Sequence, residues 1–455
     1  MKKIILWSVI GIFIAGIAVA GFWWLRRPQV MVLENGDTLK LLGVDYGKHH
    51  AAPAGGGRMF TTTNDELVVW IRKDHKPGEN VNRLPYYVYD ESGVACVPAS
   101  IVPGGAVGNL RQAVEIQGIR FDVFPRRQGK FYMARQDELP DEGEATELDK
   151  KLVISNPARG PFPQWAAEPL PDTKEDGDLS VTLTKLVSGV PIPFHAGDPD
   201  NLMNTGVQAV FRLEHNGKAV TNWQMVAVET SDATGNRLAV ASSGQNAWRN
   251  GFANNNWQDG DYTVLYQWGL WPDEPAWKVR VEFSQQSEFA DDELWTVQNI
   301  PFQPGPKQEF WNFGAAHPPA PTGSAFAEAD LNGYHVKIFP AKQFTDIGQN
   351  QNPQGGQSIQ QLIARSRDAI KGGLIIQTEP QLPDGTRLTL VKLTDNQTKD
   401  IQHLNYHDSA GYGNTTLYTY GLTDISGLTN LNLTLALHKS RFVEFTAKPE
   451  KAAAK

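Results

Sequence analysis

From about residue 30 onward, apolar and polar residues alternate in short runs that turn residues separate. The runs DTLKLLGV (37–44), DELVVWIRK (65–73), LPYYVYDESG (84–93) and IRFDVF (119–124) are strand-like, because a half-buried strand repeats every two residues. Similar runs continue nearly to the end of the chain. The pattern predicts a mainly β protein with two or three β-sandwich-like domains.

Two local signals refine this picture. Asn216-Gly217 lies between two apolar runs and predicts a hairpin turn, because both residues tolerate a positive φ. SIQQLIARSRDAIK (358–371) is the one credible helix, with apolar residues on one face and Ser358 as a possible N-cap. The last domain is therefore expected to carry one short helix.

Proline-rich and acidic stretches mark the expected boundaries. The predicted layout is a membrane anchor or signal peptide at 1–27, a β domain at 30–154, a proline-rich connector at 155–178, a tryptophan-rich β-sandwich at 179–304, a linker at 305–325, a β-sandwich with one helix at 326–449, and a disordered tail at 450–455.

A turn followed by a leucine-rich strand recurs at ENGDTLKLLGV (34–44), EDGDLSVTLTKL (175–186) and PDGTRLTLVKL (383–393). In each, an acidic or amide residue and a glycine precede the strand. Either these are equivalent strands of three related units, or the same turn chemistry has arisen more than once.

The N-terminal segment has a different character. Residues 4–25 are 22 uncharged, mostly apolar positions between a lysine pair and an arginine pair, long enough for a helix to cross the ~30 Å hydrocarbon core. A single transmembrane helix is predicted, with the bulk of the chain on the extracytoplasmic side. The alternative is a cleaved signal peptide, because AVA at 18–20 resembles a cleavage site.

Composition narrows the class of partner. The formal net charge is −8, with Lys+Arg 42 against Asp+Glu 50, and no stretch concentrates basic residues. Nucleic acid is therefore not an expected partner. Cys96 is the only cysteine, so the chain forms no intrachain disulfide.

The stretch LKLLGVDYGKHHAAPAGGG (39–57) holds the adjacent pair His49 and His50 close to Asp45. A metal site is one interpretation. On a strand, neighbouring side chains point to opposite faces, so the two rings could bind one ion only where the backbone has left the strand. The alternative is a strand end with solvated histidines.

Eight of the 13 tryptophans fall between 223 and 311. Around two of them the sequence reads GQNAWRNGFANNNWQDGD (244–261), which suggests a carbohydrate platform formed by Trp248, Asn254, Trp257 and Asp259, because flat rings stack on sugars and polar side chains bind hydroxyls. The alternative is that the rings cap a sandwich core or pack on a neighbouring domain.

Common enzyme signatures are missing. No H-E-x-x-H sequence and no G-x-x-x-x-G-K-[ST] phosphate loop occurs. The sequence predicts no catalytic residue and no cofactor, and it favours a non-enzymatic role.

Three segments together, LENGDTLKLLGVDYGKHH, DGDLSVTLTKL behind the proline-rich connector, and FVEFTAKPE, resemble uncharacterised bacterial membrane-anchored envelope proteins built of successive β-domains. The resemblance implies an overall layout and supplies no activity. The expected function is binding, adhesion or scaffolding at the cell envelope, through a glycan or an envelope protein. The alternative is a carbohydrate-binding or glycan-processing role for the tryptophan-rich domain.

Overall fold

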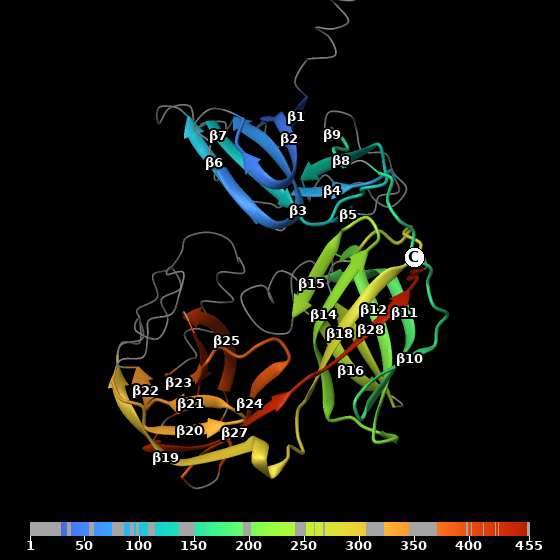
Figure 1. Ribbon diagram of the computed structural model, residues 1–455. Helices are drawn as coiled ribbons and strands as arrows, with labels where there is room; N and C mark the ends of the chain where they lie inside the picture. The colour runs from blue at the N-terminus through green and yellow to red at the C-terminus, as the bar shows by residue number, and fades with distance from the viewer. Residues whose placement is uncertain are drawn as a thin grey trace, which may run out of the picture. The chain divides into compact units, whose positions relative to one another are not determined.

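The computed structural model confirms the mainly β prediction (Figure 1). Nearly all pairings between strands are antiparallel, and the one helix within the described ranges is the short 3₁₀ segment η3 (Asp291–Glu293). The structure describes residues 29–33, 38–53, 59–74, 86–91, 95–96, 100–107, 114–135, 151–158, 160–193, 202–241, 252–258, 260–266, 269–305, 323–344, 371–396, 399–401, 403–412, 414–423, 425 and 427–452.

The chain divides into two compact units. The first unit comprises Met1–Pro163 together with the short segment Ala233–Arg237. The second comprises Gln164–Asp232 and Leu238–Lys455. The division falls within the proline-rich stretch that the sequence marks as a connector.

The first unit contains two antiparallel sheets. The five-stranded sheet has the order β1 (Val30–Val32), β2 (Thr38–Ala51), β3 (Met59–Asp74), β7 (Val114–Phe121), β6 (Ser100–Val107). The four-stranded sheet has the order β5 (Ala95–Cys96), β4 (Tyr86–Tyr89), β8 (Lys130–Arg135), β9 (Leu152–Ser155).

Strand β3 is buried on both faces over Leu67–Ile71. One face carries Leu67, Val69 and Ile71, while the other carries Val68 and Trp70, which cluster with Ile116 of β7. We call the second one the Trp70 face. Gly118 of β7 lies beneath the indole, and a Cβ at that position would be 2.8 Å from a Trp70 ring carbon. Glycine therefore allows the large ring to lie flat across the neighbouring strand.

The second unit begins with two sheets that pack aromatic residues such as Phe211, Phe283 and Phe445 against one another. The first has the order β10 (Asp172–Asp176), β11 (Leu179–Pro193), β12 (Leu202–His215), β17 (Asp261–Tyr266), β16 (Phe252–Gln258), with β13 (Lys218–Ala219) on β12 and β29 (Glu450–Lys451) on β11. The other has the order β15 (Arg237–Ala241), β14 (Trp223–Asp232), β18 (Trp277–Gln285), β28 (Arg441–Ala447).

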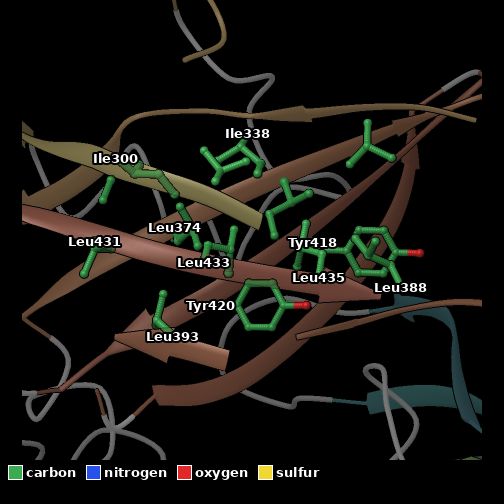
Figure 2. Close-up of a cluster of buried hydrophobic side chains, with 14 of the residues drawn as sticks. Ile300, Ile338, Leu374, Leu388, Leu393, Tyr418, Tyr420, Leu431, Leu433 and Leu435 are labelled. Atoms are coloured by element: carbon green, nitrogen blue, oxygen red, sulfur yellow. The ribbon is translucent and has the colours of Figure 1, made fainter. Parts of the chain in front are cut away.

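A nine-stranded sheet completes the second unit. Its main path is β20 (Ala327–Leu331), β21 (Tyr334–Ile338), β23 (Gly372–Glu379), β22 (Ala341–Phe344), β19 (Leu294–Gly305), β27 (Asn430–Lys439), β24 (Thr386–Asp395), and β26 (Thr415–Leu422) joins β25 (His403–Tyr412) to β23. Figure 2 shows its core, a cluster of leucine, isoleucine and tyrosine side chains from these strands. Tyr418 and Tyr420 of β26 contribute the largest rings that the figure labels.

Two strands belong to different sheets from those that the sequence suggests. The sequence places LWTVQNIPF in the tryptophan-rich domain, but β19 pairs with β27 and β22 of the nine-stranded sheet. It places FVEFTAKP in the last domain, but β28 pairs with β18 along its whole length. In the sequence, residues 286–440 thus lie between β18 and β28, two adjacent strands of one sheet (Figure 1).

The recurring turn-plus-strand segments share a structural irregularity. Each leads into a long strand, namely β2, β11 and β24, and each strand has a register shift a few residues after its start: Leu41/Gly43, Leu183/Lys185 and Leu390/Lys392. Such β-bulges bend a strand and increase its twist. Register shifts also occur in other pairings, such as β14 with β18 and β6 with β7, so both interpretations of the repeated segments stay open.

The predicted Asn216-Gly217 turn is confirmed. His215 and Lys218 are paired, and the two residues between them have φ values of 51° and 71°. The predicted helix at 358–371 lies outside the described residues apart from Lys371, as does the predicted transmembrane helix at 4–25.

Candidate functional site

The two adjacent histidines lie at the end of β2, which continues to Ala51. His49 pairs with Thr61 and its ring is exposed, whereas His50 pairs with Phe60 and is 2% exposed. The alternation of a strand thus persists through this pair, although the register shifts between Gly47 and His49. The structure does not bring the two rings together, and a shared metal ion remains a prediction.

His50 occupies a polar and aromatic niche. Its Nδ1 lies 3.3 Å from Asp45 Oδ2, and its Nε2 lies 3.5 Å from Thr62 Oγ1. The ring stacks on Phe60 with centroids 5.0 Å apart, and Phe60 in turn meets Trp70 edge-on at 6.5 Å. Because the acceptor at Nδ1 is a carboxylate, the Nδ1 proton is held there and the imidazole orientation is fixed. The arrangement is suited to anchoring the strand end.

A metal centre would need further ligands. Among the side chains that the structure describes, no group of three or more His, Cys, Asp and Glu is placed to hold a metal ion.

The tryptophan-rich region is largely core. Trp223, Trp271 and Trp277 are 3%, 5% and 0% exposed, so their rings are not available for stacking on a sugar. Trp295 of β19 is half-buried and packs on the core of the nine-stranded sheet. Trp248 and Asp259 lie outside the described residues, as do two further tryptophans of the region, Trp268 and Trp311.

Trp257 differs from these buried tryptophans. It lies on β16, at the edge of its sheet, directly opposite Tyr262 of β17, and the ring centroids are 4.9 Å apart. The indole is half-buried and its Nε1 is buried. Opposed residues share a face, and Tyr262 is 1% exposed, so Trp257 covers the rim of the core. Asn254 pairs with Leu265 on the same hairpin.

The structure also shows a cluster that sequence reasoning missed. On the Trp70 face, Glu66 of β3 forms an ion pair with Arg120 of β7, and Arg120 Nη2 lies 3.6 Å from Asp122 Oδ1. Glu66 is 5% exposed. Burial, followed by the neighbouring charge of Asp122, raises the pKa of Glu66 to about 7, and burial also raises the pKa of Asp122.

Charge repulsion contributes to the raised pKa of Glu66 beside Asp122. Glu66 Oε2 and Asp122 Oδ1 are both buried oxygens, and two ionised carboxylates side by side repel each other. A single proton held between them relieves the repulsion and leaves one negative charge for Arg120. A buried pair of carboxyls of this kind responds to pH. No local sequence signal reveals the cluster, because its members meet only after β3 and β7 pair.

The second unit holds a comparable cluster between β18 and β24. Arg387 donates from Nε and Nη2 to the two oxygens of Glu282 at 2.6 and 2.7 Å. His438 of β27 is paired with Arg387, and its Nε2 lies 2.9 Å from Thr389 Oγ1. Burial lowers the pKa of His438 to about 4. The imidazole is therefore neutral at physiological pH, and the charged pair is bidentate and complete.

Comparison with models of protein families and with curated proteins gives no match. Within the described ranges, no helix has the length and apolar character needed to cross a membrane.

Proposed function

We propose that this chain is a membrane-anchored envelope protein whose β-sheet units lie on the extracytoplasmic side and act by binding, adhesion or scaffolding. The observation that carries the proposal is the uncharged run at 4–25, which is separated by only four residues from the first strand, β1. A single apolar span followed by successive β-sheets is the organisation of an anchored surface protein.

Three of the buried or partly buried carboxylates are engaged in contacts within the protein. Glu66 is engaged by Arg120 of the neighbouring strand β7, and Asp45 by His50 of its own strand. Glu282 is engaged by Arg387 of β24, which belongs to a different sheet. Ion pairs of this kind hold sheets together and fix strand register.

Cell fractionation tests the anchor. The full chain is expected in the membrane pellet after an alkaline carbonate wash, while a variant lacking residues 1–27 is expected in the soluble fraction. Protease added to intact spheroplasts should digest the β-sheet units if they are exported. A wild-type chain that is released by carbonate, or one whose mature N-terminus is Gly21, would show a cleaved signal peptide in place of an anchor.

The alternative function is carbohydrate binding through the segment around Trp257. Its support is that Trp257 is a half-buried tryptophan of an edge strand and directly follows Asn254, Asn255 and Asn256 in the sequence. The test is a glycan array with Trp257→Ala, and Trp165→Ala serves as the matched control because Trp165 is a half-buried indole of the same unit that packs on Lys278.

The two functions differ in the outcome of this array. Glycan binding that is lost in Trp257→Ala and kept in Trp165→Ala would establish the carbohydrate role. Under the main proposal, neither substitution changes the glycan signal.

A further inference from the structure

The edge of the five-stranded sheet nearest the anchor is apolar on one face. Strand β1 is the outermost strand, and its residues alternate, with Met31 buried while Val30 and Val32 are 47% and 49% exposed. Large apolar side chains exposed two residues apart on one strand face form a small contiguous patch. Single exposed apolar side chains occur elsewhere, at Met59 and Val391, but here two lie on the same face of one short strand.

Basic side chains flank the two valines. Val30 pairs with Lys40 of β2, and Lys40 pairs with Arg72 of β3, so these three side chains form one row on the Trp70 face. Arg72 also binds Asp74 at 2.8 Å, which offsets one of the two positive charges. Arg26 and Arg27 precede the strand in the sequence, and Glu34 and Asp37 follow it. Among the described side chains, the patch therefore combines exposed valines with one unpaired positive charge, that of Lys40.

The short connection between the apolar run and β1 limits what this patch can contact. Gln29 is fixed to the first unit, because its carbonyl accepts from Leu41 N at 3.0 Å and its side chain accepts from Val153 N at 2.7 Å. Between Leu25, the end of the apolar run, and Gln29 there are four Cα–Cα steps, which reach about 14 Å when fully extended. The headgroup layer itself is roughly 5–8 Å thick. The edge strand is thus confined to the immediate neighbourhood of the lipid.

We propose that the surface formed by Val30, Val32 and Lys40 rests on the lipid headgroups of the membrane that holds residues 4–25. The valines insert among the headgroups, and the basic side chains attract anionic lipid. This docking rests on the proposed anchor, and it goes further by assigning the first unit a fixed face toward the membrane.

The test uses the full chain reconstituted in vesicles of phosphatidylcholine and phosphatidylglycerol that contain a headgroup nitroxide lipid. In a Cys96→Ala background, a fluorescent label is attached to Val32→Cys or, as the matched control, to Met59→Cys. Met59 is 82% exposed on the same sheet but pairs with Ala51, at the far end of β2, about 40 Å from the anchored edge at ~3.3 Å per residue.

The expected result is that the nitroxide quenches the label at position 32 several-fold more than the label at position 59. Lys40→Glu should reduce the quenching at position 32, and a label on Val30→Cys should repeat the result if Val32→Cys perturbs the strand. Equal quenching at positions 32 and 59 in a chain that floats with the vesicles would overturn the docking and leave the anchor in place.

Two other outcomes separate the inference from the function on which it rests. A label at position 32 that is shielded from aqueous iodide but is not quenched by the nitroxide would show that a second protein copy covers the patch, and lipid docking would be wrong. A full chain that does not float with the vesicles would refute the anchor itself, and the docking with it.

Discussion

At the scale of single residues, two clusters of charged side chains within the sheets differ in how their charges balance. Glu282 and Arg387 form a complete bidentate pair, whereas Glu66 and Asp122 share one arginine. In the first arrangement one carboxylate faces one guanidinium. The second has one carboxylate in excess, and its energy depends on a proton.

This excess charge predicts a pH dependence for the first unit. The pKa of Glu66 is raised from 4.5 to about 7 by burial and by Asp122, so the folded state binds a proton more tightly than the unfolded state does. The stabilisation is fully present below about pH 4.5 and is lost as pH rises through about 7. Chemical denaturation at several pH values, followed by tryptophan fluorescence, measures it.

Glu66→Gln removes the titrating group and keeps its shape. The variant should match the wild type near pH 5 and be more stable by about 1–3 kcal/mol near pH 8. A variant that loses stability equally at both pH values would show that Glu66 acts as a permanently ionised partner of Arg120.

The adjacent histidines offer a second residue-scale prediction. His50→Ala should destabilise the first unit by about 1–3 kcal/mol, because it empties a buried niche between Phe60 and Asp45. His49→Ala should change stability by less than about 0.5 kcal/mol, because the ring is exposed. If a metal ion held both rings, a chelator would lower the stability of the wild type, and the two substitutions would lower it by similar amounts.

At the scale of elements, the turns that precede the long strands β11 and β24 each contain a glycine with positive φ, Gly177 at 62° and Gly385 at 81°. Gly385, with φ 81°, precedes β24, and a Cβ there would lie 2.6 Å from a ring carbon of Phe442. Arg280 packs 4.5 Å from the centroid of that same ring. The glycine therefore serves both the turn and the packing of β24 beside β28.

A pair of glycine substitutions separates these two roles. Gly385→Ala should destabilise the second unit by about 2–4 kcal/mol, from backbone strain plus overpacking against Phe442. Gly217→Ala, at φ 71° with open space around the Cβ position, should cost only about 1 kcal/mol. If urea denaturation shows the same loss of unfolding free energy for both variants, the Phe442 ring moves aside at little cost.

The positions of many strands could be predicted from the sequence, and their partners could not. Alternation located β2 and β3 but made both too short. The mixed residues after Val44, with a register shift between Gly47 and His49, and the polar run Thr61–Glu66 interrupt the pattern while the pairing continues. Of the proposed site residues, the opposite exposure of His49 and His50 follows from strand alternation. The Glu66 cluster could not be foreseen, because its members meet only through tertiary pairing.

At the scale of the whole molecule, β28 near the C-terminus pairs with β18 and completes the sheet whose first strand in the sequence, β14, starts at Trp223. Val443 and Phe445 are 4% and 0% exposed, and each buried side chain contributes about 1.5–3 kcal/mol. The sequence pattern suggests that β28 is the last strand of the last domain, but in the structure it is a core strand of the sheet formed with β14 and β18.

Two truncations test this assignment. A chain that ends at Ser440 should lose the β14–β18 sheet, with a red shift of the fluorescence of buried Trp277 and protease sensitivity across 164–285. A chain that ends at Ala447 keeps β28 and should stay close to wild type. An intact sandwich in the shorter chain would show that the nine-stranded sheet, and not β28, supports it.

The position of β28 also sets the order of events during synthesis. After β18 leaves the ribosome, residues 286–440 must still be made before its partner strand exists, an interval of roughly 8–30 s at about 5–20 residues per second. Throughout that interval β18 is an unpaired edge, open to pairing with other chains. The sheet can be completed only after β28 has been translated. Until then, the exposed edge of β18 must be protected from pairing with other chains.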